Sequence, residues 1–172
     1  MDGKRRRKKI MELLLEETGP ISGSDLAQKV GVSRQAVVQD IALLRAENEK
    51  IISTNKGYLI HRQPKEKGQI YRRIFQTSHS LKDTIGELQT IVDYGGRLTN
   101  VFVEHQLYGQ IEVDLMIHNR LDAEEFVSLM NASKDQPLHV LTGGRHYHTV
   151  EADSLKNLDF IEAELKKNGY LI

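Results

Sequence analysis

Two histidines near the end of the chain have the residue type and spacing of metal ligands. His146 and His148 stand two residues apart, in or beside a strand expected at residues 147–152. Side chains at this spacing leave the same face of a strand, so both imidazoles can bind one ion. The alternative is a solvent-facing polar pair on a half-exposed strand. The chain has no cysteine, so any metal chemistry must use histidine and carboxylate ligands.

A second group of residues has the pattern of a DNA-reading helix. Ser33 can cap a helix on which Val37, Ile41 and Leu44 recur at helical spacing and form an apolar face. Four side chains near the start of this helix are left facing outward: Arg34, Gln35, Val38 and Gln39. Arginine and glutamine at such positions make paired hydrogen bonds to guanine or adenine in the major groove. An ordinary amphipathic surface helix is the alternative, and the neighbouring segments decide between the two.

The segments before this helix predict two further helices. An apolar stripe indicates a first helix that stops at Gly19-Pro20, and Ser22 with Asp25 approximates a capping box for a short second helix. Gly31 can adopt the turn conformation between the second helix and the next. The basic cluster at residues 4–9 is expected to precede the first helix as a solvated arm. Such an arm either contacts phosphate or only solubilises the terminus.

The segment after the DNA-reading helix predicts a β-hairpin. Residues 51–60 hold two short apolar runs around Asn55-Lys56-Gly57, which is a turn signal. A hairpin directly after a recognition helix is a wing. Lys56 at its tip can reach a phosphate or the minor groove, or it can be a simple turn residue.

Charge divides the chain into a basic and an acidic part. The whole chain is neutral, with 24 basic and 24 acidic side chains. Residues 1–73 hold 16 basic and 9 acidic side chains, a net of +7, and residues 74–172 hold 8 and 15, a net of −7. Because basic surface attracts the phosphate backbone, DNA contact is expected in the first part and not in the second.

Composition also predicts two domains. Residues 62–68 are polar and contain proline and glycine, which indicates a linker between domains at 1–61 and 69–172. In the second domain, strands are expected at residues 70–75, 101–105, 111–115, 138–141 and 147–152, with helices after Ser80, after Asp122 and from Leu155. Helices that return between strands make a two-layer α/β sandwich with a mainly antiparallel sheet, and the fold class is therefore α+β.

The apolar runs are too short for a membrane protein. None approaches the roughly 20 residues that a spanning helix needs. The basic start is followed by an amphipathic helix instead of the apolar stretch of a signal peptide. A soluble, cytoplasmic protein without a membrane partner is expected, and the absence of cysteine fits a reducing compartment.

The first domain resembles a known bacterial family. Residues 4–60 are similar to the winged helix-turn-helix of bacterial repressors, including the DNA-binding part of the biotin repressor family. The matching segments are Ile21-Ser22-Gly23-Ser24-Asp25-Leu26-Ala27, Val32-Ser33-Arg34-Gln35, Asp40-Ile41, Leu44-Arg45 and Gly57-Tyr58-Leu59. The residues predicted to contact DNA are Ser33, Arg34, Gln35, Val38, Gln39 and Lys56.

The second domain resembles the three-histidine domain of bacterial niacin-responsive repressors, which control genes of NAD synthesis and niacin uptake. The matching segments are His79 before a helix bearing Glu87, Gly95-Gly96-Arg97, Val103-Glu104-His105 with Tyr108-Gly109, and residues 143–149. The resemblance implies a transition-metal site formed by His79, Glu87, His146 and His148. A helix that starts near Ser80 places Glu87 roughly 10 Å along the helix axis. His79 must then reach back over the helix.

A ligand pocket is expected beside this site. His105 and Tyr108 can line it, although a strand-end histidine bonded to backbone is an equal alternative. Arg97 can hold a ligand carboxylate through paired hydrogen bonds, or it can be a solvated loop residue after two glycines. Three histidines lack any partner pattern and are expected at the surface or in loops: His61, His118 and His139.

These features indicate a dimeric transcriptional repressor that is not an enzyme. The resemblance implies nicotinic acid as co-repressor, bound near a divalent transition metal, with nickel or zinc as the expected ion and a palindromic DNA operator as the partner. A small ligand controls DNA binding only by favouring the DNA-competent arrangement. The alternatives are a metal-sensing repressor and a metal-dependent enzyme with an appended DNA-binding domain. Against the enzyme, no residue near the histidines is marked as a general base.

Overall fold

The computed structural model describes residues 2–47, 49–60 and 68–172, which belong to two compact units. The first unit is Met1–Lys65 and the second is Glu66–Ile172, and each contains its own hydrophobic core. The linker predicted at residues 62–68 lies outside the described residues except for its last position. Among the described helices, none combines the length and the apolar character needed to cross a membrane.

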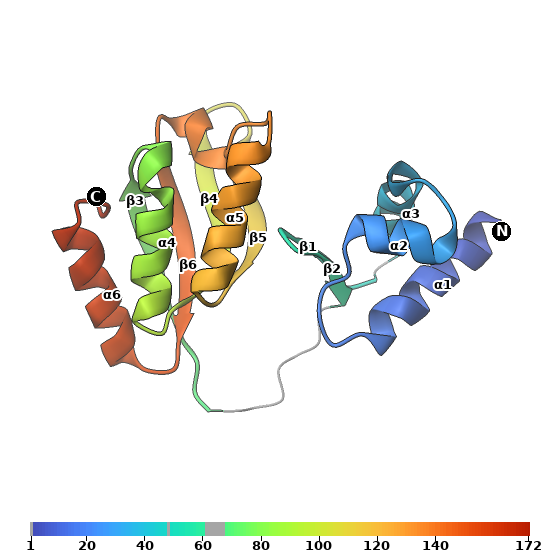
Figure 1. The fold of residues 1–172 in the computed structure, drawn as a ribbon, viewed down its shortest axis with the longest axis horizontal. Helices are drawn as coiled ribbons and strands as arrows, with labels where there is room; N and C mark the ends of the chain where they lie inside the picture. Colours follow the sequence, from blue (N-terminus) through green and yellow to red (C-terminus); the bar gives the residue numbers. More distant parts are fainter. Residues whose placement is uncertain (1, 48, 61–67) are drawn as a thin grey trace. The chain divides into compact units, whose positions relative to one another are not determined.

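The first unit consists of three helices followed by a hairpin (Figure 1). Its elements are α1 (Gly3–Glu16), α2 (Gly23–Val30), α3 (Arg34–Ala46), β1 (Ile51–Thr54) and β2 (Gly57–Ile60). The hydroxyl of Ser33 accepts a hydrogen bond from the Ala36 amide and caps α3, as its sequence predicts. Gly31 ends α2 in the left-handed conformation. The helices and the hairpin pack around buried Ile10, Leu14, Leu26, Val37, Ile41, Leu44 and Ile51.

The basic cluster at residues 4–9 lies inside α1, so the prediction of an arm before the first helix is wrong. The Arg6 guanidinium donates two hydrogen bonds to the carboxylate of Asp40 on α3, at 2.5 and 3.2 Å. Arg7 lies 3.7 Å from the same carboxylate, which is almost fully buried. These two arginines therefore hold α1 against α3, because a buried carboxylate requires a charged partner.

The hairpin is attached to the chain segment before α2. Ile21 and Tyr58 exchange two backbone hydrogen bonds of 2.8 Å each. Gly57, beside this bridge, has a φ of +133°, and a Cβ at this position would lie 2.2 Å from the carbonyl oxygen of Ile21. Glycine is therefore required for the wing to approach α2 this closely.

The second unit is a four-stranded antiparallel sheet with three helices on one face (Figure 1). The strand order is β5-β4-β6-β3. The strands are β3 (Tyr71–Ser78), β4 (Arg97–His105), β5 (Gly109–Ile117) and β6 (Arg145–Ala152), and the covering helices are α4 (Thr84–Asp93), α5 (Arg120–Ala132) and α6 (Leu155–Lys167). Two short 3-10 helices, η1 (Leu81–Asp83) and η2 (Leu138–Thr142), complete the unit. The α+β class and the mainly antiparallel sheet are confirmed.

The core of this unit lies between the sheet and the helices. Alternate residues of β6 are buried, from His146 and His148 to Val150 and Ala152. The helices supply Leu88 and Ile91 from α4 and Leu158, Ile161 and Leu165 from α6. The helix expected from Leu155 is confirmed as α6, and its three buried residues recur at helical spacing, whereas Leu155 is half exposed.

Residues 138–141 do not form the strand predicted for them. They belong to η2, which follows Pro137 and ends at Gly143. The reason is topological: β6 already pairs with β3 on one side and β4 on the other, so neither of its edges is open to a further strand.

Replacing Gly57 with alanine should destabilise the first unit by about 2 kcal/mol or more, because the new Cβ adds backbone strain and collides with the Ile21 carbonyl. Thermal unfolding of the full chain measures the loss. Gly19→Ala is the matched control, since nothing lies within 4 Å of its added Cβ and its φ is not strained. Equal stability of the two variants would contradict this explanation of the wing.

Candidate functional site

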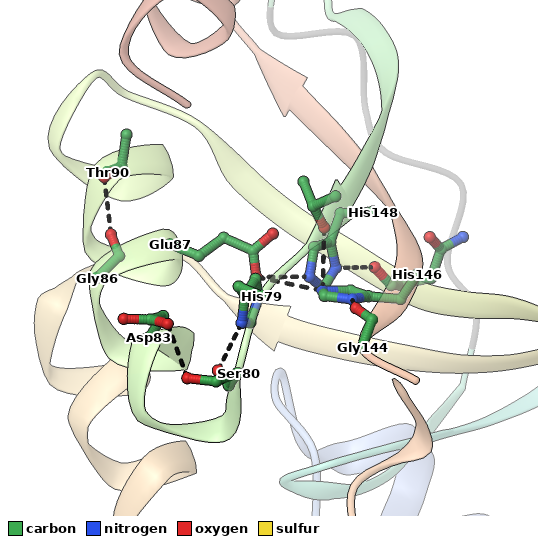
Figure 2. A network of polar contacts seen from close by, with 11 residues as sticks. His79, Ser80, Asp83, Gly86, Glu87, Thr90, Gly144, His146 and His148 are labelled. Carbon is green, nitrogen blue, oxygen red and sulfur yellow. Dashed lines mark hydrogen bonds and ion pairs between the residues drawn. The ribbon is translucent and has the colours of Figure 1, made fainter. Parts of the chain in front are cut away.

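Three histidine side chains converge on one buried carboxylate (Figure 2). Glu87 Oε2 lies 2.6 Å from His79 Nε2, 3.3 Å from His146 Nε2 and 3.3 Å from His148 Nε2. No more than 5% of any of the four side chains is exposed. The structure therefore brings together all four residues predicted as metal ligands.

Strand geometry places His146 and His148. They occupy alternate positions of β6 and both face the helical layer, so the alternative of a solvent-facing pair is wrong. The hydroxyl of buried Thr77, on the neighbouring strand β3, lies 3.1 Å from His146 Nε2.

Glu87 reaches the histidines because α4 begins later than its sequence suggests. Ser80 does not cap the helix; η1 intervenes, and α4 starts at Thr84. Glu87 is therefore in the first turn, about 4.5 Å from the helix start instead of 10 Å. His79, which comes directly after β3, meets this turn without reaching back over the helix.

Backbone carbonyl groups fix the orientation of the three imidazoles. The Nδ1 contacts are His79 to Ser80 O at 2.8 Å, His146 to Gly144 O at 2.8 Å and His148 to Asn100 O at 3.1 Å. A carbonyl oxygen only accepts, so each Nδ1 must be the donor, and a neutral ring then presents the lone pair of Nε2 to Glu87. Three nitrogen lone pairs and a carboxylate oxygen face one another, which requires a proton or a metal cation between them.

The donor set and the charges fit a divalent transition metal. Ligand atoms of His79, Glu87 and His146 lie within 4.8 Å of one another, and imidazole nitrogen with carboxylate oxygen suits zinc, nickel, copper or iron. Burial alone would raise the pKa of Glu87, but when the imidazoles are protonated, the charge of His148 and hydrogen bonds from the three histidines hold it well below its usual value. Burial acts to lower the pKa of His79, yet the hydrogen bond and charge of Glu87 raise it. The carboxylate is therefore ionised and can accept a cation.

The first unit presents a second candidate site on α3. Arg34, Gln35, Val38 and Gln39 are all exposed, while the opposite side of the helix is buried, as predicted. The groove beside the N-terminus of α2 is lined by residues 22–24, Arg34 and residues 53–58, which include Lys56. Arg45 binds the hairpin to α3 by donating to the Ile51 carbonyl at 2.8 Å. Helix and wing therefore border one groove that carries two basic residues.

Comparison with known proteins assigns both units. An HTH domain family matches residues 6–59, and the 3H domain family matches residues 72–172. A probable transcription repressor NiaR from Thermotoga maritima is 38% identical over 167 residues, which cover 97% of this chain and 93% of the relative. The transcription repressor NadR from Bacillus subtilis is 35% identical over 170 residues, which cover 99% and 94%. This chain belongs to the 3H-domain transcription repressors.

The 3H-domain repressor thus joins a DNA-binding helix-turn-helix unit to a unit that contains the histidine centre. Both relatives are named as transcription repressors and neither as an enzyme.

One histidine beside the centre was not predicted by sequence reasoning. His139, expected at the surface or in a loop, is buried in η2, with its ring centroid 4.9 Å from that of His146 and 5.5 Å from that of His79. Burial and these two neighbours lower the pKa of His139 to about 4. His118 is exposed as expected, and His61 lies outside the described residues.

The predicted ligand residue Arg97 does not join the histidine centre. Arg97 is the first residue of β4, and its guanidinium donates a hydrogen bond of 2.8 Å to the Asp153 carboxylate. His105 is at the other end of the same strand, and eight residues of extended chain separate the two by about 26 Å. One small ligand cannot contact both residues, and a ligand role for Arg97 remains a prediction.

His105 and Tyr108 lie together at the end of the β4–β5 hairpin. Their rings stack with centroids 4.9 Å apart, and His105 Nδ1 accepts backbone N–H bonds from Leu107 and Tyr108. His105 lines a hollow whose other walls include Arg145 and Tyr147. These two alternate with His146 and His148 on β6, so the hollow opens on the sheet face away from the histidine centre. A ligand role for His105 and Tyr108 remains a prediction.

Replacing Gly144 with alanine should distort the histidine centre. Its φ is +96°, and a Cβ would lie 2.7 Å from the carbonyl oxygen of His79. Gly143→Ala is the matched control, because Gly143 also has a positive φ but open space around it. Both variants should lose about 1–3 kcal/mol in thermal unfolding of chelator-treated protein. Only Gly144→Ala should shift the NMR signals of the His79 ring, and unchanged signals would show that this contact does not position His79.

Proposed function

We propose that this 3H-domain repressor controls genes of NAD synthesis or niacin uptake, with nicotinic acid as co-repressor bound near a divalent transition metal. The observation that carries the proposal is the convergence of three imidazoles on Glu87 in a unit joined to a helix-turn-helix. The resemblance to niacin-responsive repressors supports the choice of ligand. The setting is the cytoplasm, where the repressor acts as a homodimer.

His79, Glu87, His146 and His148 hold the metal in this proposal, and nickel or zinc suits their nitrogen and oxygen atoms. When bound, the ion supplies a positive charge and a Lewis-acid position for a pyridine nitrogen or a carboxylate. The three backbone-anchored imidazoles keep their lone pairs aimed at this position, and Glu87 balances part of the charge. Burial excludes competing water from the ligand atoms.

The DNA-binding half of the proposal places two α3 helices in successive major grooves of a palindromic operator. A dimer requires half-sites about 34 Å apart, one helical turn of DNA. Nicotinic acid acts as co-repressor if it binds better to the arrangement of two copies that meets this spacing.

A metal-sensing repressor is the second candidate function. The specific observation in its favour is that the protein itself offers four buried side chains whose nitrogen and oxygen atoms suit a metal ion. In this case the ion alone changes operator affinity, and nicotinic acid has no effect.

Operator affinity measured under four conditions distinguishes the two candidates. The protein is tested with and without nickel, and each form with and without nicotinic acid. We expect nicotinic acid to tighten operator binding at least fivefold in the nickel-loaded protein and not after chelation, because allosteric couplings are about 1–3 kcal/mol. Glu87→Gln keeps the shape of the side chain but removes its charge, and should abolish the response. A response to nickel alone supports the metal sensor and overturns the co-repressor. Turnover of a pyridine amide by the loaded protein would favour the enzyme alternative.

Substitutions on α3 and the wing test the DNA contacts. On an operator selected from random duplexes, Gln35→Ala should weaken binding by about 1–3 kcal/mol and relax the base preference at one position.

Lys56→Ala should weaken binding to all sequences and reduce the slope of log affinity against log salt concentration by about one. Lys82→Ala, an exposed lysine of the second unit, is the control for loss of one charge. If Lys56→Ala behaves like Lys82→Ala, the wing does not contact phosphate.

A further inference from the structure

His139 carries a buried ring nitrogen without a hydrogen-bond partner among the described residues. Three buried side-chain atoms lack a hydrogen-bond partner within the described part of the chain: Thr84 Oγ1, Glu87 Oε1 and His139 Nε2. The His139 side chain belongs to a residue that is only 7% exposed. A buried polar atom without a partner is destabilising, so its presence points to a partner that binds from outside the chain.

The ring of His139 is as close to the histidine centre as the predicted metal ligands are to one another. Its centroid lies 4.9 Å from that of His146, whereas the His79–His146 and His146–His148 centroid distances are both 4.8 Å. Yet the ion pairs described for Glu87 involve only the other three histidines. His139 therefore lies beside the group of ligands without belonging to it.

The backbone around His139 holds it in place. Its carbonyl oxygen accepts a hydrogen bond from the Gly144 amide at 2.9 Å and another from the Thr142 hydroxyl at 3.2 Å. The next two residues of η2, Val140 and Leu141, are exposed, so this short helix turns His139 alone toward the interior. The unpaired nitrogen is thus a fixed feature of the site.

We propose that His139 is a ligand-binding residue, whose Nε2 hydrogen-bonds a pyridine carboxylate such as nicotinic acid beside the His79–His146–His148 centre. This inference rests on the proposed function, because the ligand is the proposed co-repressor. An imidazole nitrogen can donate to a carboxylate or accept from a protonated ring, and either bond removes the cost of burying Nε2 unpaired. A metal held by His79, Glu87, His146 and His148 would bind one polar group of such a ligand, and His139 would supply a second, directional contact.

The test compares three variants of the full chain by calorimetric titration of nicotinic acid into nickel-loaded protein. His139→Leu removes the hydrogen bond at similar volume, His139→Gln keeps a polar group, and Val140→Ala changes an exposed neighbour on η2 as the control. We expect His139→Leu to weaken nicotinic acid binding at least tenfold, His139→Gln to weaken it less, and Val140→Ala to leave it unchanged.

Two further readouts separate ligand binding from other roles of His139. Nickel affinity, measured by competition with a chelator, should stay within threefold of the parent protein in all three variants. The thermal midpoint of chelator-treated His139→Leu should equal or exceed that of the parent, because an unpaired buried nitrogen is replaced by an apolar group. A merely structural histidine would instead lower the midpoint on substitution.

Each other outcome overturns the inference in a recognisable way. Unchanged nicotinic acid binding by His139→Leu overturns the role of His139 while the proposed function stands. Loss of nickel together with nicotinic acid makes His139 a metal ligand instead. Lower thermal midpoints in both His139 variants, with equally weakened binding, make its role one of packing. If the nickel-loaded parent protein does not bind nicotinic acid, the proposed function fails and the inference fails with it.

Discussion

The repulsion between four hydrogen-bond acceptors is the constraint on which the second unit depends. The Nδ1 atoms of His79, His146 and His148 each donate a hydrogen bond to a backbone carbonyl. The lone pairs of the three Nε2 atoms then face the buried Glu87 carboxylate. A buried charge without a partner is very costly. The arrangement of β3, α4 and β6 therefore requires a cation or protons between these side chains, and the residues present suit a metal ion.

Local rules predicted the parts of the site that lie on one element. The common face of His146 and His148 follows from the two-residue repeat of a strand, and the outward face of α3 follows from the Ser33 cap and the helical repeat of Val37 and Ile41. His79 and Glu87 came from family resemblance, because no spacing rule joins a strand end to the first turn of the next helix.

The residues that were misplaced depend on contacts between distant parts of the chain. His139 was expected outside the core because residues 138–141 look like a strand, and only the pairing of β6 on both edges turns them into η2. The basic cluster shows the same limit for charge. The net charge of +7 includes Arg6 and Arg7 as if both were available to bind DNA. In the structure both guanidinium groups contact the Asp40 carboxylate instead. Sequence counts cannot tell internal pairs from surface charge.

The distribution of the four side chains has a mechanical consequence. They come from the end of β3, the first turn of α4 and alternate positions of β6, so an ion held between them would tie together segments that are far apart in the chain. In a chain without cysteine, such a tie acts as the cross-link that a disulfide provides elsewhere, since it closes long loops and restricts the unfolded chain. Metal supply would then set the rigidity of the second unit, and in a cell short of metal the same chain would be more flexible.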